Sequence, residues 1–131
     1  MIIDTSVLVA LERRFAAGDE GVLTLLEEPF IAAIEIAELQ IGVLMADTDS
    51  RRTARARFAA RVREHCRVIP FGELESERMA SIYVELRRRG TPIGDHDLQI
   101  AATALVHGHS VMTANAREFG QVPGLILTPV P

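Results

Sequence analysis

The sequence predicts a three-layer α/β domain in which helices cover both faces of a mainly parallel sheet. Short apolar segments alternate with longer segments whose apolar residues recur at helical spacing. Glycine or proline closes several of these segments. The 131 residues, 48% hydrophobic and 24% charged, suit one compact domain spanning 1–131.

In the first part of the chain, apolar runs and breakers predict two strands and three helices. The opening apolar run predicts a buried strand at 1–5. Amphipathic spacing predicts a helix at 6–15, which a glycine closes, and another at 19–28, which a proline closes. A brief apolar strand is then expected at 30–33 and a helix at 35–46.

The second part continues the alternation of helices and strands. At 51–65, apolar residues recur every four positions, which predicts an amphipathic helix with its arginines turned outward. A strand is expected at 67–71, a long helix at 73–89 that ends at a glycine, and a helix at 95–107. The last strands are predicted at 109–113 and 125–127.

Charge and cysteine content exclude several classes of protein. All 14 basic residues are arginine, which excludes Schiff-base chemistry and the lysine of a phosphate-binding loop. Residues 51–67 hold seven arginines and one acid, a charge of +6 that leaves −10 for the rest of a chain whose net charge is −4. A single cysteine, no basic leader and no apolar run near ~20 residues predict a cytoplasmic protein without a membrane span.

Acid or amide side chains stand beside apolar sequence at four places in the chain. Asp4 follows the first strand, and Glu38 lies in the helix at 35–46. Asp95 and Asp97 open a later helix, and Asn115 follows a C-terminal strand. Each has an ordinary alternative, such as a helix cap for Asp4 or an exposed charge for Glu38. Because the ends of parallel strands share one edge, several oxygens converge there, as Mg²⁺ or Mn²⁺ requires.

Other polar residues receive plainer interpretations. Glu35 shares a helix face with Glu38, and we expect an outward charge there, the alternative being a group that supports Glu38. The four histidines lack the spacing of a zinc site, so we expect ordinary packing or surface roles, with His96 noted because it adjoins Asp97. Cys66 has no paired motif and is expected to be buried.

Four segments together resemble the signature blocks of PIN-domain ribonucleases, closest to the VapC-type toxins of toxin-antitoxin pairs. In chain order they read MIIDTSVLVALE, AAIEIAELQIGV, PIGDHDLQIAATAL and VMTANAREFGQVPGL. The resemblance implies that Asp4, Glu38 and Asp97 are the catalytic metal ligands and that Asn115 takes the fourth position. Thr5 or Ser6 then matches the small hydroxyl residue after the first acid, and Thr113 matches the threonine before the fourth block.

The same resemblance implies a function and partners. It implies an endoribonuclease, a VapB-like antitoxin that blocks the site, and a homodimer. With Mg²⁺ or Mn²⁺ held by the three acids, we expect water to attack the phosphodiester and leave 5′-phosphate and 3′-hydroxyl ends. Asp95 stands where similar sequences carry proline or another neutral residue, so it either adds to the site or caps the helix. Arg51, Arg55 and Arg61 either contact RNA or an acidic partner, or form a solvated face.

Two rival functions are weighed against this one. The first is a binding module with the same fold, in which the acids are structural and no catalysis occurs. The second is an aspartate-nucleophile phosphatase, which needs a lysine and a second aspartate where this chain has Ser6.

Overall fold

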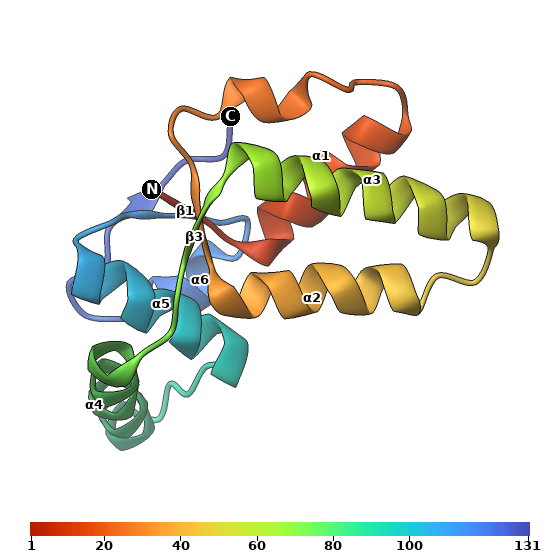
Figure 1. Ribbon diagram of the computed structural model, residues 1–131. Coiled ribbons are helices and arrows are strands. Elements are labelled where there is room, and N and C mark those ends of the chain that lie inside the picture. The colour runs from red at the N-terminus through yellow and green to blue at the C-terminus, as the bar shows by residue number, and fades with distance from the viewer.

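The chain folds around a short parallel sheet, and the computed structural model describes all 131 residues (Figure 1). The strands are β1 (Ile2–Ile3), β2 (Phe30–Ala32), β3 (Arg67–Ile69), β4 (Val111–Met112) and β5 (Leu127–Thr128). The helices are α1 (Thr5–Ala16), the 3₁₀ helix η1 (Val22–Leu25), α2 (Ala33–Leu44), α3 (Asp49–His65), α4 (Glu73–Arg89), α5 (Asp95–His107) and α6 (Ala116–Phe119). None of the helices is long and apolar enough to cross a membrane.

All strand pairs are parallel, and the strand order is β3-β2-β1-β4-β5. From β1 the chain first builds outward through β2 to β3, and it then returns to place β4 on the other side of β1. The order therefore reverses between β1 and β4, and parallel sheets bind ligands at the carboxyl ends of strands at such a point. Asp4 and Thr113 directly follow these two strands.

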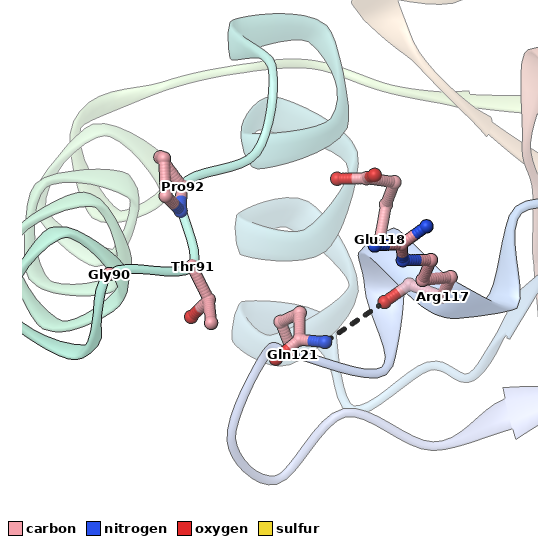
Figure 2. Close-up of a pocket in the computed structure, with 6 residues that line it drawn as sticks. All are labelled: Gly90, Thr91, Pro92, Arg117, Glu118 and Gln121. Atoms are coloured by element: carbon pink, nitrogen blue, oxygen red, sulfur yellow. Dashed lines mark hydrogen bonds between the residues drawn. The ribbon is translucent and has the colours of Figure 1, made fainter.

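A small pocket lies beside this part of the molecule. One of its walls is the loop between α4 and α5, and the other is α6 with the residue shortly after it (Figure 2). The positions of both walls follow from the packing of α5, which contacts α4 and α6.

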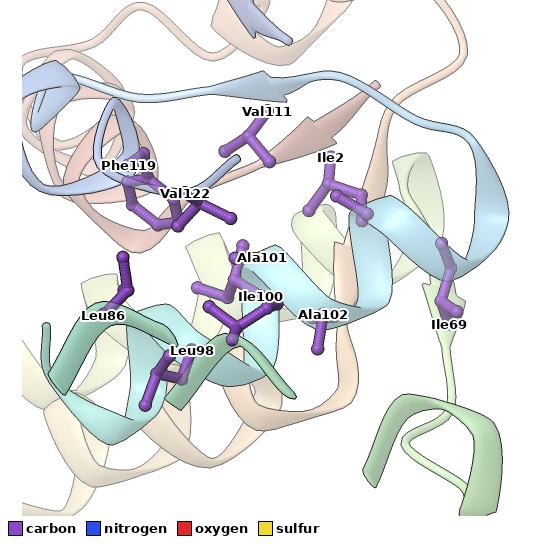
Figure 3. Packing of buried hydrophobic residues seen from close by; sticks show 13 residues of the cluster. Ile2, Ile69, Leu86, Leu98, Ile100, Ala101, Ala102, Val111, Phe119 and Val122 are labelled. Carbon is purple, nitrogen blue, oxygen red and sulfur yellow. The ribbon is translucent and has the colours of Figure 1, made fainter. Parts of the chain in front are cut away.

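Alternate residues of the strands fill two separate cores, one on each face of the sheet. Ile2 and Val111 belong to the core built with α4, α5 and α6 (Figure 3). Their chain neighbours Ile3 and Met112 belong to the other core, built with α1, η1 and α3. Side chains of a strand point alternately to opposite faces, so β1 and β4 each contribute to both cores. The predicted three-layer α/β/α fold with a parallel sheet is confirmed.

One predicted helix is wrong, and one observed helix was not predicted. The helix expected at 19–28 is wrong, because only η1 forms there. Gly21 precedes η1, and burial of Val22, Leu23 and Leu26 against α1 and α3 fixes this segment in place of a regular amphipathic helix. Helix α6 was not predicted, since its four residues are too few to show a helical period.

Candidate active site

Asp4 is held at the end of β1 by a network of hydrogen bonds. Its side chain is 3% exposed and caps α1. The carboxylate oxygen Oδ2 accepts bonds from Ser6 Oγ at 2.5 Å, from Thr113 Oγ1 at 2.8 Å and from Ser6 N at 3.3 Å. All of these bonds go to Oδ2, so Oδ1 remains available to a ligand.

The two hydroxyl groups that donate to Asp4 also accept hydrogen bonds from the backbone after β4. Ser6 Oγ accepts a bond from Ala114 N at 3.0 Å, and Thr113 Oγ1 accepts one from Asn115 N at 2.8 Å. Each hydroxyl thus donates to Asp4 and accepts from the loop that follows β4. This loop and the first turn of α1 are tied together at the point where the strand order reverses.

Glu38 lies two turns into α2 and contacts residues from two other elements. Thr5 Oγ1, in the first turn of α1, donates to Glu38 Oε2. His96 Nδ1, in the first turn of α5, lies 2.6 Å from Glu38 Oε1. These contacts join positions 33 and 58 residues apart, which no local pattern in the sequence reveals.

Asp97 lies in the first turn of α5, and its pKa reports on its neighbours. Partial burial and, after it, the negative charges of Asp4, Glu118 and Glu38 together raise the pKa of Asp97 to about 6. Three acids from α6, α2 and the end of β1 therefore act on one carboxylate. The structure brings Asp4, Glu38 and Asp97 into one electrostatic cluster.

The remaining predicted residues of the site occupy its borders. Asn115 caps the N-terminus of α6, and its side chain makes no capping hydrogen bond. Glu118, one turn later, is close enough to raise the pKa of Asp97. Asp95 is the exposed first residue of α5 and lines a cavity together with residues of α4, among them Tyr83.

The expectation that Glu35 is an outward charge is wrong. Its side chain is 0% exposed, and its Oε2 accepts a bond from Ala32 N at 2.7 Å at the start of α2. Its Oε1 is buried without a partner. Burial raises the pKa of Glu35 well above its ordinary value, and the nearby charges of Asp4 and Glu38 raise it further. The spacing of Glu35 from Glu38 did not reveal this burial, because it suits an exposed helix face as well as a buried one.

Cys66 is buried, as expected, and its thiol is unreactive. Burial raises the pKa of the thiol to about 12, and the charge of Glu35 contributes in the same direction. Since thiolate is the reactive form, Cys66 takes no part in chemistry at neutral pH.

The donor set of the cluster fits a hard divalent cation. Its members are carboxylates, the ligands that Mg²⁺ and Mn²⁺ prefer. Their mutual repulsion is the kind of energy that a bound cation relieves. In the structure no three acidic, histidine or cysteine side chains stand in ligating geometry, and Glu38 contacts Thr5 and His96. The fit therefore rests on the chemistry of the donors and on the unpaired Oδ1 of Asp4.

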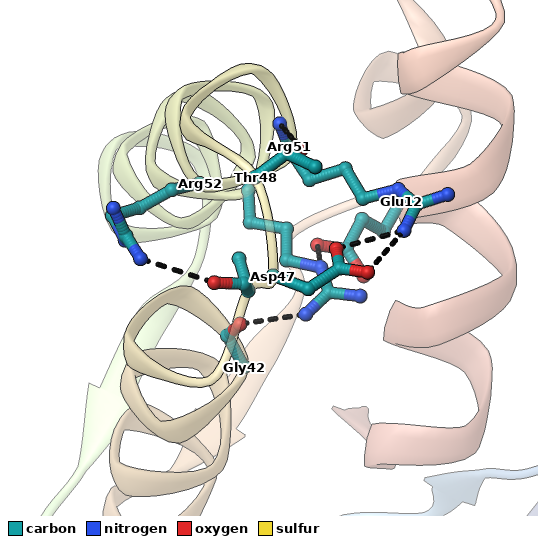
Figure 4. Close-up of polar contacts among 8 residues, drawn as sticks. Glu12, Gly42, Asp47, Thr48, Arg51 and Arg52 are labelled. Carbon is teal, nitrogen blue, oxygen red and sulfur yellow. Dashed lines mark hydrogen bonds and ion pairs between the residues drawn. The ribbon is translucent and has the colours of Figure 1, made fainter.

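The arginines of α3 are exposed, as the spacing predicted, except for the partly buried Arg55, and most have partners. Arg51 binds Asp47 at 2.7 Å, Arg55 donates to Gly42 O at 2.7 Å, and Arg61 binds Glu64 at 3.1 Å. Figure 4 shows the corner between α2 and α3, where the contacts of Arg51 and Arg52 lie beside Gly42 and Glu12. Local partners reduce the positive charge that this surface offers to phosphates.

Comparisons with known proteins agree with the geometry. The family model described as "PIN domain" matches residues 1–125. The chain is 34% identical to Ribonuclease VapC1 of Rickettsia felis, over 95% of this chain and 92% of that protein. It is 31% identical to Ribonuclease VapC of Rickettsia bellii, over 100% of this chain and 96% of that protein.

Solved structures show the same fold. VapBC2 of Rickettsia felis, bound to a promoter DNA fragment, matches with a TM-score of 0.83 at 23% identity, over 99% of this chain and 98% of that one. VapBC-1 of Haemophilus influenzae matches with a TM-score of 0.78 at 25% identity, over 98% and 96% of the two chains. The parallel sheet, the acids at its carboxyl edge and these matches lead to one conclusion: the chain belongs to the PIN-domain family and is related to its VapC ribonucleases.

Proposed function

We propose that this chain is a Mg²⁺- or Mn²⁺-dependent endoribonuclease, the toxin of a type II toxin-antitoxin pair in the cytoplasm. The observation that carries the proposal is the cluster of Asp4, Glu38 and Asp97 at the point where the strand order reverses. The ribonucleases among its relatives support RNA as the substrate.

Each residue of the cluster has a separate role in holding the cation. Asp4 would hold the cation through Oδ1, since Ser6 and Thr113 bind Oδ2 and so orient the carboxylate before substrate arrives. Glu38 and Asp97 approach from α2 and α5. When bound, the cation lowers the pKa of a water molecule and neutralises charge that develops on the scissile phosphate.

The expected products follow from the direction of attack. Water adds to phosphorus and the bond from phosphorus to O3′ breaks, which leaves a 3′-hydroxyl on one fragment and a 5′-phosphate on the other. The 2′-hydroxyl is not needed as a nucleophile. Asn115 replaces a carboxylate at the border of the site, which favours a single tightly held cation.

The test compares Asp4→Asn with Asp49→Asn, an exposed aspartate on α3. Asp4→Asn should lower RNA cleavage by at least ~100-fold, as expected when a group central to catalysis is lost, with an unchanged circular dichroism spectrum. Asp49→Asn should cleave as the natural chain does, and excess EDTA should stop both active proteins. Cleavage by Asp4→Asn at the rate of the natural chain, or full activity of the natural chain in EDTA, would exclude this mechanism.

An inactive binding module with the same fold is the alternative. It predicts that RNA binds and remains intact with Mg²⁺ or Mn²⁺ present, and that Asp4→Asn changes no product. Mapping of cleaved ends on total RNA therefore decides between the two.

We further propose that a VapB-like antitoxin covers the acidic cluster and that two copies of the chain pair. The solved neighbours that are VapBC assemblies support the first partner. The end of α2, past Glu38, leaves Leu44 66% and Met45 76% exposed, the kind of apolar surface that a partner covers.

Co-expression with the protein of the neighbouring short reading frame tests the antitoxin proposal. The pair should copurify and cleave no RNA, and Leu44→Glu with Met45→Glu should separate them without loss of cleavage. Failure of the natural chain to copurify would exclude that partner. Light scattering tests the homodimer, and a mass of one chain would exclude it.

A further inference from the structure

The pocket between the α4–α5 loop and α6 has a size and a lining that suit one nucleobase. Its volume is about 230 Å³, below the ~300–1,000 Å³ of pockets that hold drug-sized ligands. Figure 2 shows the loop residues on one side and the residues of α6 on the other. The lining residues are Gly90, Thr91, Pro92, Arg117, Glu118 and Gln121.

The polar groups of the pocket are not committed to partners elsewhere in the chain. Neither Arg117 nor Glu118 takes part in an ion pair, in contrast to most arginines of α3. Gln121 makes one long bond, from Nε2 to the carbonyl oxygen of Arg117 at 3.4 Å. The pocket thus presents a guanidinium, a carboxylate and an amide that are free to bind a ligand.

The charges in the pocket argue for a base and against a phosphate. The positive charge of Arg117 and the negative charge of Glu118 cancel, and Glu118 would repel an anion placed beside it. A ligand with acceptors on one edge and donors on another satisfies both groups. Unpaired bases of RNA are recognised in this way, through hydrogen bonds to their edges and by stacking on arginine.

The pocket also adjoins the acidic cluster. One wall of the pocket is the loop that leads directly into α5, whose first turn carries Asp97. Asn115, which borders the cluster, lies only two residues before Arg117 on the same turn of chain. A nucleotide in the pocket would therefore belong to the same strand as a phosphate held at the cluster.

We propose that this pocket binds an unpaired guanine next to the scissile phosphate, an inference that rests on the proposed nuclease function. Arg117 donates to O6 and N7 of the base, the pairing that arginine makes with guanine in nucleic acids. Glu118 accepts from N1–H and from the N2 amino group. Gln121 donates or accepts as the base requires.

The other bases fit this set less well. Adenine places its N6 amino donor against the guanidinium of Arg117 and has no donors at positions 1 and 2 for Glu118. Cytosine and uracil lack N7. A good bidentate pair discriminates by about tenfold or more, so the preference for guanine is measurable.

The first experiment needs no catalysis. Isotopically labelled protein is titrated with each of the four nucleoside 5′-monophosphates and with inorganic phosphate, and the side-chain amide signal of Gln121 is followed by NMR. GMP should shift it at concentrations about tenfold below those of the other nucleotides. Arg117→Gln and Glu118→Gln should each weaken GMP binding about tenfold or more, whereas Arg78→Gln, an exposed arginine of α4 without an ion pair, should not.

The second experiment maps cleavage sites on RNA. The natural chain should cut beside a guanine at one fixed position, and Arg117→Gln should lose that preference. Equal shifts with AMP or with phosphate alone, or cleavage without a guanine preference, would overturn the guanine site. GMP binding without any cleavage of RNA would overturn the nuclease and leave the guanine site standing.

Discussion

Thr113→Val tests whether hydrogen bonds across the reversal of strand order hold Asp4 in place. Valine keeps the shape of threonine but lacks the hydroxyl, which donates to Asp4 Oδ2 at 2.8 Å and accepts from Asn115 N at 2.8 Å. A bond to a charged group contributes about 1.5–3 kcal/mol and a neutral one about 0.5–1.5 kcal/mol. Ser6 still donates to Asp4, and the half-exposed Asn115 can bond to water, so the expected loss is about 2–3 kcal/mol.

Urea unfolding in EDTA, followed by circular dichroism, measures the free energy of unfolding of each variant. Thr113→Ser keeps the hydroxyl and should lose less than about 1 kcal/mol. Thr103→Val removes a buried hydroxyl that only donates to Gln99 O, four residues back on α5, and should also lose less than about 1 kcal/mol. The reasoning would be refuted if Thr113→Val unfolded at the same urea concentration as the natural chain. It would also be refuted if Thr103→Val lost as much free energy of unfolding as Thr113→Val.

Two further predictions concern pH and metal. Burial raises the pKa of Glu35 in the folded chain, so the folded chain keeps a proton that the unfolded chain releases near pH 4.5. The free energy of unfolding should therefore fall as pH rises above that value. Glu35→Gln should flatten this fall, so a Tm difference from the natural chain that does not grow from about pH 5 to pH 8 would contradict it. Mg²⁺ at a hundred times its Kd should add about 2.7 kcal/mol of stability. EDTA and Asp97→Asn should each abolish the gain in Tm, and an equal gain in Asp97→Asn would contradict binding at the cluster.

Most of the secondary structure was predictable because its signals are local. The helix at 73–89 has charged first and last turns and a glycine after it, and α4 has those bounds. The segment at 19–28 carries a similar local signal but forms η1. Contacts with α1 and α3 decide its conformation, and these contacts depend on residues far away in the chain.

The candidate site was predictable to the extent that topology places it. A parallel sheet brings the residues after β1 and β4 to one edge, so Asp4 and Thr113 meet whatever their distance in sequence. The burial of Glu35 was not predictable, because its spacing from Glu38 fits an exposed face and a buried face equally well. The contact of His96 with Glu38 depends on the packing of α5 beside α2, and no pattern in the sequence of either helix predicts it.

The sequence left a choice between Asp4 as a helix cap and Asp4 as a metal ligand, and the structure removes the need to choose. Oδ2 serves the cap and the hydroxyl groups, while Oδ1 is left for a cation. An asparagine at this position keeps one acceptor for those donors but turns two N–H groups toward the cation. Asp4→Asn should therefore keep the fold and lose catalysis, whereas Asp4→Ala should lose catalysis and about 1 kcal/mol or more of stability with the cap. If the two variants unfold at the same urea concentration, the cap contributes nothing and the orientation of Asp4 has another cause.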